Sequence, residues 1–174
     1  MNGEQCLQEA YEAIYRGDFE SAESWFLQAI EREPNNASYY YKASITCSRN
    51  GKLSSAMAFA GKALELEPWR PAYAFHYQTL QARCRIAEAE KMLSQSPPGA
   101  EEAVLKLREA ASLDPLSAEA RLYLGIAYRL LPDLQRAAAS LKEALQLDPQ
   151  MEEARRQLHE LRTERRRTQF KRTR

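Results

Sequence analysis

Histidine, cysteine and clustered carboxylate side chains are the residues of this chain that could carry chemistry. His76 and His159 are the only histidines, and neither has a cysteine, serine or carboxylate near it at the spacing of a catalytic triad. The sequence also contains no glycine-rich phosphate loop and no zinc-hydrolase motif. We therefore expect a protein that is not an enzyme, with no catalytic residues and no cofactor.

The three cysteines, Cys6, Cys47 and Cys84, lie far apart and form no C-x-x-C pair. Their spacing fits neither a disulfide framework nor a zinc site. We expect them to be small buried residues, and we expect no metal site. Adjacent glutamates at 101–102 and 152–153 open predicted helices, where carboxylates complement the helix dipole.

Composition and charge define the class of protein. Hydrophobic residues make up 44% of the chain and charged residues 28%, which is typical of a folded protein rather than a disordered one. No apolar run approaches the roughly 18 residues that cross a bilayer. The first twenty residues lack the basic and apolar segments of a secretory signal. We therefore expect no membrane span and a cytoplasmic location.

A recurring proline marks the organisation of the chain. Glu-Pro or Asp-Pro recurs at steps of 34, 47 and 34 residues, at Pro34, Pro68, Pro115 and Pro149. Each proline follows a stretch with helical spacing of apolar residues, because proline cannot continue a helix. The segment 37–69 shows the unit most clearly, as two predicted helices joined at Asn50-Gly51 with small residues where the helices must approach.

The same second-helix pattern precedes each proline, A-x3-F…A…P in its fullest form. Its four copies are Ala22, Phe26, Ala29 and Pro34; Ala56, Ala60, Ala63 and Pro68; Ala103, Leu107, Ala110 and Pro115; Ala137, Leu141, Ala144 and Pro149. A first-helix pattern, L-G-x2-Y, stands intact at Leu124-Gly125 and Tyr128. A period of 34 residues is that of the tetratricopeptide repeat, and over residues 3–150 the chain resembles this family.

The resemblance implies an all-α, right-handed superhelical solenoid of antiparallel helix pairs. Its four repeats would span about 3–36, 37–70, 71–117 and 118–150. For the first helix two alternatives stay open, a frayed helix or a register that turns Leu7, Ala10 and Ile14 inward. A cap, Asn2 with Gln5 three residues later, begins this helix.

The third repeat holds 13 extra residues. Helical spacing continues without a breaker to about residue 95, so we predict one long first helix over 72–95, stopped at 96–99. A shorter helix with a loose insert is the alternative. Such a helix would be either a contact element or a partner for an equally long second helix.

After the repeats, we predict a capping helix over 151–163, because the outer face of a last repeat has no neighbour. The segment 164–174 is a basic tail for which we expect disorder. From residue 155 onward nine Lys and Arg stand against two Glu, a net charge of +7, so the preceding residues carry −6.

In this family the first helices line a concave groove that binds peptides. The residues of this chain that match the family's groove-facing positions are, in the second, third and fourth repeats in turn, Tyr41, Lys42, Ile45 and Arg49; Phe75, His76, Thr79 and Arg83; and Leu122, Tyr123, Ile126 and Arg129. In the first repeat they are Leu7, Tyr11 and Tyr15. The alternative is that the aromatic side chains pack between repeats.

Aromatic and aliphatic side chains with a line of arginines suit a peptide with apolar and acidic groups. We therefore predict a non-enzymatic protein–protein interaction adaptor or scaffold. Some family members clamp the acidic C-terminus of chaperones with Lys and Asn. The corresponding places here hold Tyr41, Ile45, Ala72 and His76, so we expect no such clamp.

The basic tail supports an alternative from another class, a nucleic-acid- or ribosome-associated protein. The tail side chains that could neutralise phosphates are Arg162, Arg165, Arg166, Arg167, Lys171, Arg172 and Arg174. Self-association through the long helix of the third repeat is a third hypothesis. The identity of the partner does not follow from the sequence.

Overall fold

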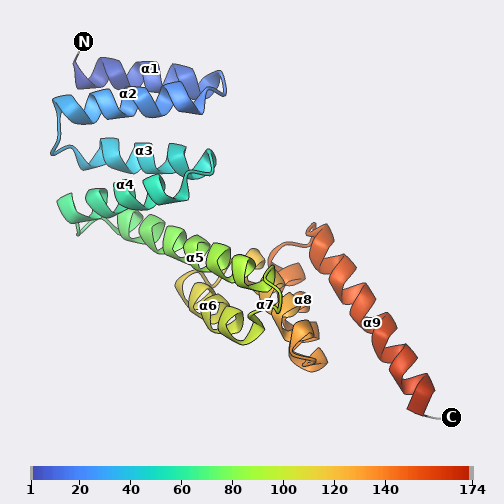
Figure 1. The fold of residues 1–174 in the computed structure, drawn as a ribbon. Coiled ribbons are helices and arrows are strands. Elements are labelled where there is room, and N and C mark those ends of the chain that lie inside the picture. Colours follow the sequence, from blue (N-terminus) through green and yellow to red (C-terminus); the bar gives the residue numbers. More distant parts are fainter. Residues whose placement is uncertain (1, 173–174) are drawn as a thin grey trace. The chain divides into compact units, whose positions relative to one another are not determined.

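The computed structural model of the protein describes the backbone of residues 2–172 and the side chains through residue 164. Within these residues all regular structure is helical, and Figure 1 shows the helices in chain order. Their bounds are α1 (Gly3–Tyr15), α2 (Phe19–Arg32), α3 (Ala37–Arg49), α4 (Leu53–Leu66), α5 (Pro71–Leu93), α6 (Ala100–Leu113), α7 (Ala118–Leu130), α8 (Leu134–Leu147) and α9 (Glu152–Arg172). The all-α prediction is confirmed. None of the described helices combines the length and apolar composition that a bilayer crossing needs.

The helices begin at polar caps that the sequence provides. Asn2 and Gln5 form a reciprocal capping box at α1, in which each side chain accepts the other residue's backbone N–H. Asp18, Ser117 and Asp133 each accept one backbone N–H in the first turn of α2, α7 and α8. These bonds satisfy donors that a helix leaves unpaired at its first turn.

Small side chains form the seams between paired helices. Ala10, Ser44 and Gly125 are all buried on the first helix of a pair. The approach is closest at Gly125, where an added Cβ would lie 2.6 Å from Cγ of Leu141 in α8. In α1 the buried residues are Gly3, Cys6, Ala10 and Ala13, and Leu7 and Ile14 pack against the same core. The inward register of α1 is therefore the correct alternative.

The chain divides into two compact units, residues 1–81 and 82–174. In unit 1 the core includes Phe26 with Ala10 and Ala43, and further along the chain Leu80 with Cys47. In unit 2 the end of α5 packs with α6 and α7 around buried side chains, and α8 and α9 extend this packing. The buried side chains that the end of α5, α6 and α7 share are Ala82, Ile86, Ala89, Ala103, Leu107, Ala110, Ala111, Ala120, Leu124 and Ala127.

Helix α5 has 23 residues and confirms the extended first helix of the third repeat. The loose-insert alternative is wrong. Helix α6 has 14 residues, as do α2, α4 and α8, so the extra length of α5 has no equally long second helix beside it. Instead Tyr73 and Leu80 pack in unit 1 and Ile86 packs in unit 2, so successive segments of one helix serve two cores.

Helix α9 continues to Arg172, well past the predicted end of the capping helix at residue 163. The segment for which we expected disorder is thus helical through Arg172, because its residues include no breaker and are good helix formers. The buried side chains Ala154, Leu158 and Leu161 cover the last repeat, as the spacing of the apolar residues indicated.

The turns of the first, second and fourth helix pairs share one backbone hydrogen bond. Gly17 and Gly51 have φ of 76° and 74°, and the next residue donates its N–H back to the preceding helix. Pro132 occupies the same place in the fourth repeat, and Asp133 N–H donates to Tyr128 C=O at 2.9 Å.

Candidate functional site

A pocket of about 260 Å³ lies between α1, α2 and α3 in unit 1. Its lining residues are Tyr11, Ile14, Phe19, Phe26, Lys42, Ile45, Thr46 and Arg49. Three of these, Lys42, Ile45 and Arg49, are groove positions predicted for the second repeat, and Tyr11 is one predicted for the first. The structure therefore brings predicted residues of two repeats together at one pocket.

The body of the pocket is apolar and well supported. Phe26 is fully buried, and the Tyr11 ring meets it edge-on with 6.4 Å between centroids. Ile14 packs on the same core. Phe19 and Thr46 were not predicted, because neither occupies a groove position of the family. Phe19 lies on the second helix of the first repeat, and Thr46 lies on the buried face of the first helix of the second repeat.

Two cations flank this apolar body. Lys42 Nζ lies 5.5 Å from the centroid of the Tyr11 ring, a cation–π contact that holds the ammonium group beside the pocket. Arg49 is exposed at the last turn of α3. An apolar cavity with adjacent ammonium and guanidinium groups can take an aliphatic or aromatic side chain that has a carboxylate close by.

Tyr41 and His76 are engaged in packing within unit 1. The Tyr41 ring lies 4.7 Å from Tyr73 and 5.3 Å from His76, measured between ring centroids. Ser44 Oγ donates to the Ala56 carbonyl at 2.7 Å and lies 2.8 Å from His76 Nε2. Because the serine proton is already donated, His76 Nε2 carries the proton of that second bond. These two side chains follow the alternative of packing between repeats.

The other predicted residues of α5 have different surroundings. Phe75 is 66% exposed and Thr79 is half-buried, both in unit 1. Arg83 is exposed and belongs to unit 2. Tyr15 is also almost fully exposed, whereas Leu7 is half-buried in the core of unit 1. A ligand role for these side chains stays a prediction.

In unit 2 the predicted groove residues of α7 contact neighbouring helices. Leu122 is buried in a cluster with Ala154 and Leu158 of α9, and Ile126 packs against the same cluster. Tyr123 Oη donates to Glu90 of α5 at 2.7 Å. Burial, aided by this bond, raises the pKa of Tyr123 well above its ordinary value.

Arg129 is held by one face of α9. Its guanidinium donates to Gln157, to Glu160 at 3.1 Å and to Glu164 at 2.8 Å. We expected the arginine at position 129 to be open to a ligand. This expectation is wrong, because the Arg129 guanidinium already pairs with two carboxylates of α9. Sequence reasoning missed these partners, although their spacing of three and four residues places them on one helical face.

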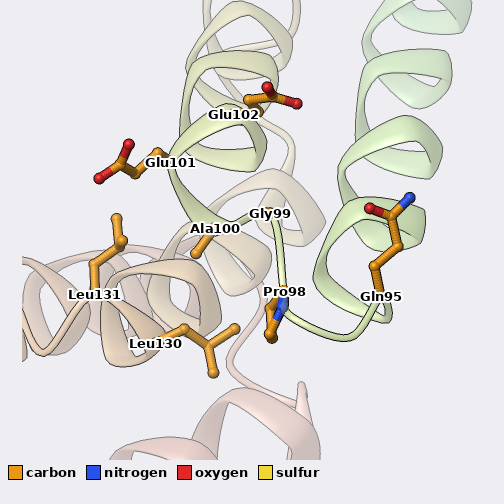
Figure 2. Close-up of a pocket in the computed structure, with 8 residues that line it drawn as sticks. All are labelled: Gln95, Pro98, Gly99, Ala100, Glu101, Glu102, Leu130 and Leu131. Atoms are coloured by element: carbon orange, nitrogen blue, oxygen red, sulfur yellow. The ribbon is translucent and has the colours of Figure 1, made fainter.

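A second cavity, of about 580 Å³, lies at the start of α6 and the end of α7. Figure 2 shows its lining residues, Gln95, Pro98, Gly99, Ala100, Glu101, Glu102, Leu130 and Leu131. Leu130 is the last residue of α7 and Leu131 caps it, and the two glutamates lie in the first turn of α6. The carboxylates complement the dipole of α6, which gives them a structural role.

The remaining candidate groups have few described contacts. Cys6 and Cys47 are buried as expected, and burial raises the pKa of Cys47 to about 12. Cys84 is only half-buried. In the part of the chain with described side chains, no group of three or more His, Cys, Asp or Glu could hold a metal ion.

The polyanion prediction for the tail is largely outside the described side chains. Arg162 is exposed on α9. The side chains beyond residue 164 are not described, and they include those of Arg165, Arg166, Arg167, Lys171, Arg172 and Arg174. Phosphate binding by this segment stays a prediction.

Consecutive antiparallel helix pairs with alanine-rich seams and a terminal cap define a helical repeat protein. The sequence model of the tetratricopeptide repeat family matches residues 7–71 and 97–152. The chain therefore belongs to the tetratricopeptide repeat family, whose fold serves protein–protein interaction. The unmatched stretch between these ranges contains most of α5, the helix with the extra length.

Solved structures support the fold. The chain is similar to MamA, residues 41 to the end, from Desulfovibrio magneticus RS-1, with 18% identity and a TM-score of 0.56 over 94% of this chain and 85% of that one. It is also similar to a tetratricopeptide repeat protein from Parabacteroides merdae, with 21% identity and a TM-score of 0.53 over 93% and 60% of the two chains. No curated protein matches the sequence.

Proposed function

We propose that the protein is a non-enzymatic adaptor that binds a segment of another protein at the unit 1 pocket. The segment places an apolar side chain against Tyr11 and Ile45 and a carboxylate beside Lys42 and Arg49. The observation that carries this proposal is the convergence of groove positions from two repeats on one apolar cavity with adjacent cations.

The two cations contribute differently to the proposed site. Lys42 is oriented by its contact with the Tyr11 ring, so less side-chain entropy is lost when a carboxylate binds it. Arg49 is exposed and presents a fork of donors that matches a carboxylate. The aromatic rings supply contact area at low entropic cost.

We expect Arg49→Glu to weaken ligand binding about tenfold, which corresponds to about 1.4 kcal/mol. The replacement removes a forked donor and adds a charge that repels an acidic ligand. Peptides are first selected from a random display library on the immobilised full chain, and we expect an apolar residue close to Asp or Glu in them. Their affinities are then measured by fluorescence anisotropy for parent and variant chains.

Arg108→Glu is the matched control, because Arg108 is an exposed arginine on α6 in unit 2. It changes the net charge equally and should leave the affinity unchanged. Circular dichroism confirms that both variants stay helical. If the selected peptides bind Arg49→Glu as tightly as the parent, the unit 1 pocket is not the binding site.

A further inference from the structure

Helix α9 presents to α7 the chemistry that suits an acidic amphipathic ligand. Its apolar residues Ala154, Leu158 and Leu161 are buried, at spacings of four and three residues, and the first two pack with Leu141 and Ala144 of α8 as well as Leu122 of α7. Beside this apolar stripe, Gln157, Glu160 and Glu164 converge on Arg129. These are the two components, apolar anchors and carboxylates, that the groove positions of the fourth repeat were predicted to bind.

A helix that only covers the last repeat needs an apolar inner face and a polar outer face. The convergence of three polar side chains on one guanidinium is additional to that requirement. Arg129 is only 20% exposed, so its charge is held close to the protein and depends on these partners. The face of α7 therefore recognises the charge pattern of α9 as well as its apolar side chains.

The attachment of α9 has the features of an exchangeable contact. Only three of its described side chains are buried, and Glu160 and Glu164 are 47% and 49% exposed in their pairs with Arg129. Because water reaches both carboxylates, another acidic ligand can compete with them for Arg129. Residues 148–151 connect α9 to α8. This short connection gives α9 a high effective concentration at its binding surface, so even weak contacts keep α9 bound.

We propose that α9 is an internal ligand, and that the surface it covers is a second binding surface. Leu122, Ile126 and Arg129 of α7 and Leu141 and Ala144 of α8 form this surface. The partner that it fits is an amphipathic helix with an apolar stripe and carboxylates spaced as in α9. Such a partner helix replaces α9 and takes over its contacts with Arg129. This surface lies in unit 2 and is separate from the unit 1 pocket.

A peptide with the sequence of residues 150–164, QMEEARRQLHELRTE, is the probe. In the full chain, Glu160→Lys with Glu164→Lys loosens α9 without changing α7. We expect the labelled peptide to bind this loosened chain at least tenfold more tightly than the parent, because the internal competitor is weakened. Fluorescence anisotropy measures both affinities. Equal binding to the two chains, or no binding to the loosened chain, would overturn the proposal.

Two controls distinguish specific recognition of the peptide from general attraction between opposite charges. Glu101→Lys with Glu102→Lys makes the same change in net charge on α6 and should bind the peptide as weakly as the parent. On the loosened chain, a second peptide with lysines at positions 160 and 164 should bind at least tenfold more weakly than the probe, because its lysines meet the Arg129 guanidinium. Equal binding of the two peptides would show that Arg129 does not recognise the carboxylates.

A measurement on the parent chain keeps the test independent of how the variants fold. The parent is labelled with ¹⁵N, so that its fragments differ in mass from those of the unlabelled probe. At millimolar probe, hydrogen exchange in residues 152–164 of the parent should increase as α9 is displaced. Unchanged exchange at saturating probe would contradict displacement.

Discussion

Replacing Gly125 with valine should lower the free energy of unfolding by about 3 kcal/mol, through overpacking of a close helix seam. A Cβ at this position would lie 2.6 Å from Leu141 Cγ and 3.3 Å from the Ala137 carbonyl oxygen. Leu141 is fully buried and cannot move aside freely. Valine adds two further methyl groups to this contact. Urea denaturation followed by circular dichroism gives the change.

A glycine on another helix provides the control for helix propensity. Gly61 lies in α4, and an added Cβ there would meet only Tyr77 Cε2, at 3.6 Å. Gly61→Ala should therefore gain about 0.5–1 kcal/mol, whereas Gly125→Ala should lose stability. Shortening Leu141 to alanine should partly compensate for Gly125→Val. If Gly125→Val lowers the free energy of unfolding equally with leucine and with alanine at position 141, overpacking against Leu141 is not the cause.

Phe26→Ala should cost about 3–5 kcal/mol, because the ring is fully buried and its loss leaves a cavity. Phe26 packs with Ala10 and Ala43, and it also supports the Tyr11 ring at the unit 1 pocket. Both tryptophans of the chain, Trp25 and Trp69, lie in unit 1. Their emission during denaturation therefore reports on the affected unit.

Phe75→Ala is the matched control, since it removes the same side chain from a site that is 66% exposed. It should change stability by no more than about 0.5 kcal/mol. A Phe26→Ala variant that unfolds at the same urea concentration as Phe75→Ala would contradict the assignment of Phe26 to the core.

The repeat period predicted the helix pairs well, because each copy carries its own local signals. A proline ends the second helix, and small residues mark the seam. The long α5 followed from uninterrupted helix formers between the third repeat's start and residue 93. The end of α9 did not follow, because the regular apolar positions stop after Leu161, although helix-forming residues continue beyond them.

The candidate site was predictable only in part. Lys42, Ile45 and Arg49 reach the unit 1 pocket because their positions in the repeat fix their direction. The contact of Arg129 with α9 was not predictable in the same way. It joins a groove position to a residue 35 positions away, and the family pattern specifies no side chains in a capping helix. Likewise, Glu90, which accepts from Tyr123, lies in the extra length of α5, for which the family pattern specifies no side chains.

The short sequence separation of the contacts has a consequence for folding kinetics. The Ser44–Ala56 bond within one repeat joins residues 12 apart, and the bonds of Tyr123 to Glu90 and of Arg129 to Glu164 join residues 33 and 35 apart. Little chain entropy is lost in closing such short loops. Proteins with this kind of local topology fold within microseconds to milliseconds. Each helix pair can therefore nucleate early, while later parts of the chain are still being synthesised.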